Sequence, residues 1–272
     1  MSTFSKFNDQ AILITGGSSG LGEEFARQLV CMGARVGLIA RRAELIEKLA
    51  GELDGQGERV VTAAADVGDR ESLKSAIFDI ADRLKIKVFD RVILNAGVGI
   101  TFKASDFSAA MLEEVTRVNY LGAANTIDAV LPGMIAAGAG HIVGISSLSA
   151  RRGLPMGFAY GASKAAMTTM LEGMRVELKP KGIAITVIHP GFIRTPMTSN
   201  QETAQPGLMD ADVAVMGMLR AIAAQKKQYN FPFSTTFLTG LLRRMPVGIS
   251  DFLVEKFVLK SIEDAERRAD QK

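Results

Sequence analysis

Residues 11–22 decide the fold of this 272-residue chain, and they read AILITGGSSGLG. Residues 11–15 are apolar or β-branched, which is typical of a buried strand, and the residues after 20 have the apolar spacing of a helix. The glycines between them permit positive φ and lack a Cβ, while the start of a helix offers unpaired N–H groups and positive dipole charge. The stretch therefore predicts a strand, a phosphate-binding turn and a helix. A plain connecting turn is the alternative interpretation.

The rest of the chain repeats this alternation of short aliphatic runs and longer helical segments. We expect strands at 11–15, 34–40, 59–65, 91–94, 141–146 and 183–189. We expect helices at 21–32, 43–53, 70–84, 109–137 and 158–179. Such alternation predicts an α/β fold, a Rossmann-like doubly wound parallel sheet with helices on both faces.

The composition excludes several classes of protein. Hydrophobic residues make up 47% and charged residues 22%, which is ordinary for a globular protein, and the net charge of +3 is spread along the chain, so we expect no nucleic-acid partner. One cysteine and two histidines supply neither a disulfide nor a metal site. Because the sequence has neither a signal peptide nor a bilayer-spanning run, we expect a cytoplasmic protein.

The end of the second expected strand indicates which cofactor the turn would bind. In an NAD site an acidic residue usually stands here for the ribose hydroxyls, but Ala40 has that place, and Arg41 and Arg42 follow it. An arginine can hold the 2′-phosphate of NADP by charge-assisted bonds. The residues therefore favour NADP(H) over NAD(H). The alternative is that the two arginines only begin a solvated helix.

A second pair of residues points to acid–base chemistry. Tyr160 and Lys164 lie four positions apart in an expected helix and so share one face. A phenol has a pKa of about 10, and nearby positive charge would lower it toward neutrality. Ser147 follows the fifth expected strand, close enough for both hydroxyls to reach one substrate oxygen. We therefore expect Lys164, together with a cationic nicotinamide ring, to lower the pKa of Tyr160.

The order and spacing of several motifs resemble the short-chain dehydrogenase/reductase family over about residues 8–200. The matching motifs are TGGSSGLG at 15–22, Asp66-Val67, Asn95-Ala96-Gly97, Asn119, Ile145-Ser146-Ser147, Tyr160-Gly161-Ala162-Ser163-Lys164 and Pro190-Gly191-Phe192-Ile193-Arg194-Thr195. Each motif falls at or just after the carboxyl end of an expected strand, or on the helix that follows, where open α/β sheets bind their ligands.

The resemblance implies a role for each matching residue. It makes Asn119, Ser147, Tyr160 and Lys164 the catalytic residues, with Asn119 supporting a proton-relay water. By the same resemblance Lys164 also holds the nicotinamide ribose, Asp66 and Val67 contact the adenine, and Asn95 lies near the adenosine ribose. The expected cofactor contacts are Gly16, Ser18, Ser19, Gly20, Leu21, Gly22, Arg41, Arg42, Asp66, Val67, Asn95, Ala96, Gly97, Tyr160, Lys164, Pro190, Gly191, Ile193 and Thr195. Asn119 has an alternative interpretation as a helix kink or a polar bond in the core.

These features predict an NADP(H)-dependent oxidoreductase that moves hydride between the nicotinamide and a carbonyl or secondary alcohol, with Tyr160 as general acid and base. An apolar small-molecule substrate is favoured by Phe192, Met197, Leu208 and Met209. Two alternatives remain. One is a non-catalytic NADP(H)-binding redox sensor, and the other is a membrane-surface enzyme that reduces lipid carbonyls.

We expect residues 1–200 to form the cofactor-binding and catalytic core, and 201–272 to add a variable substrate loop and a C-terminal helical region to the same domain. Beyond about 201 the pattern weakens to a helix at 210–225, a short edge strand at 229–232 and an apolar-faced helix at 249–268. Many relatives end in a strand and a glycine-rich turn at a tetramer interface, an ending that this chain lacks. A homodimer is therefore expected, with the tail as a lid, a dimer contact or an amphipathic membrane anchor.

Overall fold

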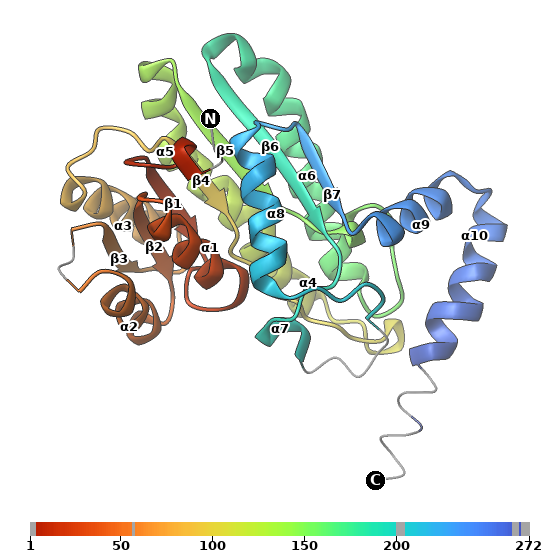
Figure 1. Cartoon of the computed structure of the whole chain (residues 1–272). Helices are drawn as coiled ribbons and strands as arrows, with labels where there is room; N and C mark the ends of the chain where they lie inside the picture. The colour runs from red at the N-terminus through yellow and green to blue at the C-terminus, as the bar shows by residue number, and fades with distance from the viewer. Residues whose placement is uncertain (1–3, 56–57, 200–204, 263–266, 268–272) are drawn as a thin grey trace.

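The computed structural model describes residues 4–55, 58–199, 205–262 and 267, and its centre is one parallel sheet (Figure 1). Seven strands lie in the order β3-β2-β1-β4-β5-β6-β7, and every neighbouring pair is parallel. The strands are β1 (Ala11–Thr15), β2 (Arg35–Ala40), β3 (Val60–Ala64), β4 (Arg91–Leu94), β5 (Gly140–Ile145), β6 (Ile183–Pro190) and β7 (Gln228–Phe231). The strand order reverses between β1 and β4, which is where doubly wound sheets open a ligand crevice.

Helices cover both faces of the sheet, which confirms the predicted fold class (Figure 1). The helices are α1 (Gly20–Cys31), α2 (Ala43–Leu53), α3 (Arg70–Arg83), α4 (Ala109–Thr116), α5 (Gly122–Ala137), α6 (Phe158–Leu178), α7 (Pro196–Ser199), α8 (Ala211–Ala223), α9 (Phe233–Arg244) and α10 (Val247–Val254). Buried side chains of α3, α5 and α6 pack on one face, and those of α1, α2 and α8 pack on the other.

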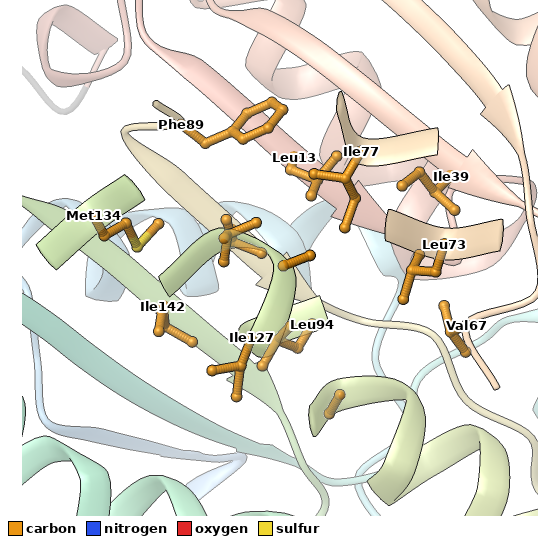
Figure 2. Close-up of a cluster of buried hydrophobic side chains, with 14 of the residues drawn as sticks. Leu13, Ile39, Val67, Leu73, Ile77, Phe89, Leu94, Ile127, Met134 and Ile142 are labelled. Atoms are coloured by element: carbon orange, nitrogen blue, oxygen red, sulfur yellow. The ribbon is translucent and has the colours of Figure 1, made fainter. Parts of the chain in front are cut away.

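The core explains why the strands read as unbroken apolar runs. All five residues of β1 are buried; Leu13 belongs to the cluster under α3 and α5, whereas Ile12 and Ile14 belong to the cluster under α1 and α8. Figure 2 shows the first cluster, with Leu13 near Ile77 of α3. A strand that is covered on both faces has no solvent side, so its sequence loses the polar alternation.

The expected helix at 109–137 is interrupted. The structure has α4, then a π-helical turn at Arg117–Leu121, then α5. The turn contains Asn119 and is followed by Gly122, where an added Cβ would lie only 2.5 Å from the Val67 side chain. Single π-helical turns inside helices are frequent at functional sites.

The chain after residue 205 differs from the expectation in two ways. The expected edge strand at 229–232 is present as β7, which pairs with β6 at the sheet edge, and α9 and α10 follow it. Residues 233–244, to which we assigned no element, form α9. The expected helix at 249–268 is α10 plus a π-helical turn at Glu255–Leu259, and its end lies outside the described residues. Among the described residues, no helix is long and apolar enough to span a bilayer.

Candidate active site

The glycine turn has the backbone geometry that its sequence predicts. Gly16 and Gly20 have φ values of +72° and +58°, in the left-handed region that favours glycine. Ser19 is the N-cap residue of α1 but makes no side-chain capping bond. The first N–H groups of α1 therefore remain available at the edge of the turn, together with the positive end of the helix dipole.

Gly22 and Asn95 pack against the glycine turn and hold it in place. A Cβ on Gly22 would lie 2.1 Å from the Gly16 carbonyl oxygen and 2.7 Å from Asn95 Nδ2. Asn95 Nδ2 donates to the carbonyl oxygens of Thr15 and Gly16, at 3.1 Å each. Gly22 does not line the cleft described next, so its expected cofactor contact stays a prediction. The missing Cβ of Gly22 instead allows α1 to pack closely against the turn.

A cleft of about 380 Å³ runs along the carboxyl ends of the strands. It brings together every residue expected at the cofactor except Gly22, and Ser147, Tyr160 and Lys164 among those expected in catalysis. Asn119 does not line it. The cleft is also lined by residues outside the expected contacts. The sequence analysis named Ala40, Ile145, Ser146 and Met197 for other reasons, and it did not name Ala65, Val98, Val118, Pro196 and Thr198. Most of these adjoin a quoted motif, so position beside a motif is the signal that could have found them.

Arg41 and Arg42 lie at one end of this cleft, and both are exposed. Arg42 donates to the hydroxyl oxygens of Ser18 and Ser19, at 2.9 and 3.1 Å. This contact ties the end of β2 to the glycine turn. Two guanidinium groups thus stand beside the turn, where a phosphate on an adenosine ribose would need positive charge.

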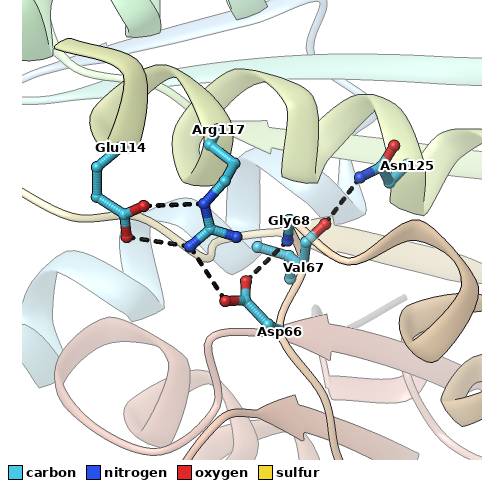
Figure 3. A network of polar contacts seen from close by, with 6 residues as sticks. All are labelled: Asp66, Val67, Gly68, Glu114, Arg117 and Asn125. Atoms are coloured by element: carbon cyan, nitrogen blue, oxygen red, sulfur yellow. Dashed lines mark hydrogen bonds and ion pairs between the residues drawn. The ribbon is translucent and has the colours of Figure 1, made fainter. Parts of the chain in front are cut away.

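Asp66 lines the cleft and is held from behind by an ionic network (Figure 3). Its carboxylate accepts from the Gly68 N–H at 2.8 Å and from Arg117 at 3.1 Å, and Arg117 also pairs with Glu114 at 2.8 Å. Burial raises the pKa of Asp66, but the bonds from Arg117 and Gly68 more than offset this, and the pKa lies below its usual value. Arg117 thereby links the loop after β3 to the π-helical turn.

The network predicts an acid-dependent stability. Arg117→Gln is expected to lower the free energy of unfolding at neutral pH by about 1 kcal/mol, because it removes a partly buried ion pair. A carboxylate with a lowered pKa contributes stability above its unfolded pKa of about 3.9, and this stability is lost as the pH falls through the folded pKa. The difference between wild type and variant should therefore shrink below about pH 4, as measured by urea unfolding.

A control for this effect is Arg83→Gln, which removes an exposed pair between Arg83 and Asp79 within α3. We expect the control to cost less than Arg117→Gln. An equal loss of stability in the two variants would argue against a special role for the Asp66 network.

Tyr160 and Ser147 meet in the cleft from α6 and from the loop after β5. Both residues line the cleft. Burial raises the pKa of Tyr160, and the nearby Ser147 hydroxyl offsets only part of this rise. Lys164 is not among the causes of this shift, and the lowering expected from Lys164 together with a cationic nicotinamide ring stays a prediction. The pKa of Tyr160 is raised because burial removes water from the phenolate.

The position of Lys164 explains why it does not lower the pKa of Tyr160 in this structure. Its Nζ donates to the Ile145 carbonyl oxygen at 2.8 Å and lies 5.9 Å from the centre of the Tyr160 ring, so the ammonium group is directed to the end of β5. The side chain is 3% exposed, and burial lowers the pKa of Lys164 to about 8. Lys164 and Tyr160 both line the cleft, and the ammonium group forms no hydrogen bond with the tyrosine hydroxyl in the described part of the chain.

Asn119 is fully buried behind the cleft. Its Nδ2 donates to the Val98 carbonyl oxygen and to Ser163 Oγ, both at 3.0 Å, and its Oδ1 accepts from the Val98 N–H at 2.7 Å. The side-chain amide is therefore engaged by protein groups, and the expected support of a relay water stays a prediction. The interpretation as a polar bond in the core fits these contacts, since the amide braces α6 one residue before Lys164.

The last segment of the cleft is the loop after β6. Ile193 and Thr195 line it, and a Cβ on Gly20 would lie 3.2 Å from the Thr195 side chain, so this loop packs against the glycine turn. Of the four residues that favoured an apolar substrate, Met197 alone lines the cleft. Met209 packs instead against the core cluster under α8.

Comparison with known proteins agrees with this geometry. Residues 10–206 match the profile of a family described as short chain dehydrogenase. An uncharacterized oxidoreductase of Myxococcus xanthus is 34% identical over 239 residues, covering 88% of this chain and 94% of that protein. Dehydrogenase/reductase SDR family member 7B of Bos taurus is 32% identical, covering 88% of this chain and 78% of that protein.

Solved structures give the same result. A 3-oxoacyl-(acyl-carrier protein) reductase from Brucella melitensis, crystallised with bound NAD, is 29% identical and superposes with a TM-score of 0.72 over 82% of this chain and 89% of that chain. The family profile covers well over half of the sequence, and the relatives are alike over most of their length. The chain therefore belongs to the short-chain dehydrogenase family and is an oxidoreductase.

Proposed function

We propose that the protein transfers hydride between NADP(H) and a small carbonyl compound or secondary alcohol, with Tyr160 exchanging the proton. The observation that carries this proposal is that Tyr160 and Ser147 line the same cleft as the glycine turn and Lys164. A redox sensor that only binds the cofactor has no need for this pair of hydroxyls.

The lining residues fit a dinucleotide. Open N–H groups at the start of α1 suit a pyrophosphate, and the turn brings Gly16, Ser19 and Gly20 to the lining. Arg41 and Arg42 would hold a 2′-phosphate, and Lys164 would hold the nicotinamide ribose. When bound, the nicotinamide cofactor supplies or accepts the hydride.

The raised pKa of Tyr160 gives the hydroxyl a defined role. In carbonyl reduction the substrate oxygen gains one proton as the carbon gains hydride, and a phenol with a raised pKa is protonated at neutral pH. Tyr160 would give its proton to that oxygen, and Ser147 would donate a hydrogen bond to the same atom. In alcohol oxidation the proton would return to Tyr160.

The test is a screen of ketones, aldehydes and secondary alcohols with the purified chain, in which the change in NADPH absorbance measures turnover. We expect turnover of at least one compound, and better turnover of apolar than of charged ones if Met197 contacts the substrate. Tight binding of NADPH with no turnover across a broad panel would favour the redox sensor.

Cofactor preference can be tested separately. Structures similar to this chain were solved with NAD, in the Brucella reductase, and with NADP, in ElxO, and we infer that Arg41 and Arg42 favour NADP(H) here. Arg41→Ala is expected to weaken NADPH binding by about tenfold or more and to leave NADH binding nearly unchanged, because a lost charge-assisted bond costs about 1.5–3 kcal/mol. Fluorescence titration measures both affinities.

Arg59→Ala is the matched control, since Arg59 is exposed and does not line the cleft. It should leave both affinities unchanged. Equal losses for NADPH and NADH in Arg41→Ala would contradict a role at the 2′-phosphate.

A further inference from the structure

A second cavity, of about 240 Å³, lies between the loop that follows Ser147 and the C-terminal helices α9 and α10. In Figure 1 these helices extend beyond β7, at the edge of the sheet opposite β3. The lining residues are Arg151, Arg152, Gly153, Leu242, Arg243, Met245, Val247 and Ser250. None of them lines the catalytic cleft.

Positive charge gathers at this cavity. Arg151 and Arg152 come from the loop, and Arg243 comes from the last turn of α9. Arg152 forms an ion pair with Asp251 of α10. For the part of the chain that the structure describes, neither Arg151 nor Arg243 forms an ion pair, so two of the three guanidinium charges are not neutralised.

Ser250 supplies an independent observation. The residue is 2% exposed, and its Oγ is buried without a hydrogen-bond partner among the described residues, as is the Nε of Arg152. Buried polar groups without a partner are rare and costly, because the group has lost its water and gained nothing. An acceptor placed in the cavity would satisfy the hydroxyl. Ser250 also lies in the first turn of α10, where the helix dipole favours an anion.

We propose that this cavity binds a phosphate-type anion, with Arg151, Arg243 and Ser250 as donors. Guanidinium groups bind phosphate oxygens through paired N–H bonds, and the serine hydroxyl would donate to a further oxygen. The Arg152–Asp251 pair joins the loop to α10 and so keeps the two walls of the cavity together.

Two kinds of molecule could present such a phosphate group to the cavity. The group belongs to either a soluble phosphate compound or the headgroup of a phospholipid, since the surrounding helices expose Phe237, Val247 and Phe252 by 63%, 72% and 58%. Apolar side chains around an anion site suit a membrane surface as well as an amphiphilic small molecule.

The first experiment is calorimetric titration of the full chain with inorganic pyrophosphate, in the presence of saturating NADPH so that the catalytic cleft does not contribute. We expect binding by wild type, and affinity lowered by about tenfold or more in Arg243→Gln and in Ser250→Ala. Arg244→Gln is the matched control, because Arg244 is the next residue, exposed and outside the cavity. Thermal unfolding checks that each variant is folded.

The second experiment identifies the source by co-sedimentation with phosphatidylglycerol vesicles. Sedimentation that is lost in Arg243→Gln and kept in Arg244→Gln supports the site with a lipid headgroup as its ligand. Pyrophosphate binding with the same dependence, but without sedimentation, supports the site with a soluble ligand. The proposal is overturned if wild type binds neither probe, or if binding is the same in wild type, Arg243→Gln and Ser250→Ala.

Discussion

Tyr160→Phe is expected to lower kcat by about 10²- to 10⁴-fold and to spare most of the affinity for NADPH. The substitution removes one oxygen from a ring that lies in the cleft with the glycine turn and Lys164, so the shape of the site is retained while the proton donor is lost. Ser147 would still polarise the substrate oxygen but would have no tyrosine hydroxyl beside it. Steady-state kinetics measures kcat, and fluorescence titration measures NADPH affinity.

Tyr229→Phe provides the control. Tyr229 stacks on Phe231 in β7 and does not line the cleft, so removal of its hydroxyl should leave kcat unchanged. Full turnover by Tyr160→Phe would refute the proposed proton transfer, whereas loss of activity in both variants would indicate a general effect on the fold.

The second large effect is expected at Gly22, which does not itself line the cleft but packs against Gly16 and Asn95, which do. Gly22→Ala should lower the free energy of unfolding by about 1–3 kcal/mol and weaken NADPH binding, because the new methyl group would displace the Gly16 carbonyl and the Asn95 amide. The clash is with backbone, at 2.1 Å, so a change of side-chain rotamer cannot relieve it. Urea unfolding and fluorescence titration measure the two effects.

Gly51→Ala is the control that tests whether the loss of stability in Gly22→Ala depends on its position or on the change from glycine to alanine. Gly51 lies in α2 with no atom within 4 Å of its added Cβ, so alanine there should be neutral or should stabilise the helix by about 0.5–1 kcal/mol. If Gly22→Ala were as stable as Gly51→Ala and bound NADPH normally, the close packing of α1 against the turn would not matter for the cofactor site.

Much of the sheet could be predicted because its strands are buried on both faces. The bounds of β1, β4 and α2 are those that the sequence indicated, and other strands differ only at their ends. α9 was missed for a physical reason. Its first residues include Ser234, Thr235 and Thr236, which are weak helix formers, and it has no fully buried side chain to produce an apolar stripe.

The sequence predicted which residues share the cleft, but it did not predict the hydrogen bonds that these residues make. The parallel strands collect their carboxyl ends at one edge, which is why motifs far apart in the sequence share a cleft. The spacing of Tyr160 and Lys164 could not reveal that the lysine donates to the Ile145 carbonyl, nor that Asn119 would be enclosed by Val98 and Ser163. Such details depend on contacts between elements that the sequence does not place.

The attachment of α9 and α10 bears on how enzymes of this kind diversify. The two helices follow the edge strand β7, which pairs with Val187–Pro190, and the Gly191 N–H donates to the Phe231 carbonyl oxygen at 2.7 Å. The Arg152–Asp251 ion pair also joins α10 to the loop after Ser147. No described residue after Phe231 lines the nucleotide cleft, so exchange of this tail would keep the lining residues. Recombination at this one position in the chain would change the ligands of the tail and keep the residues of the redox site.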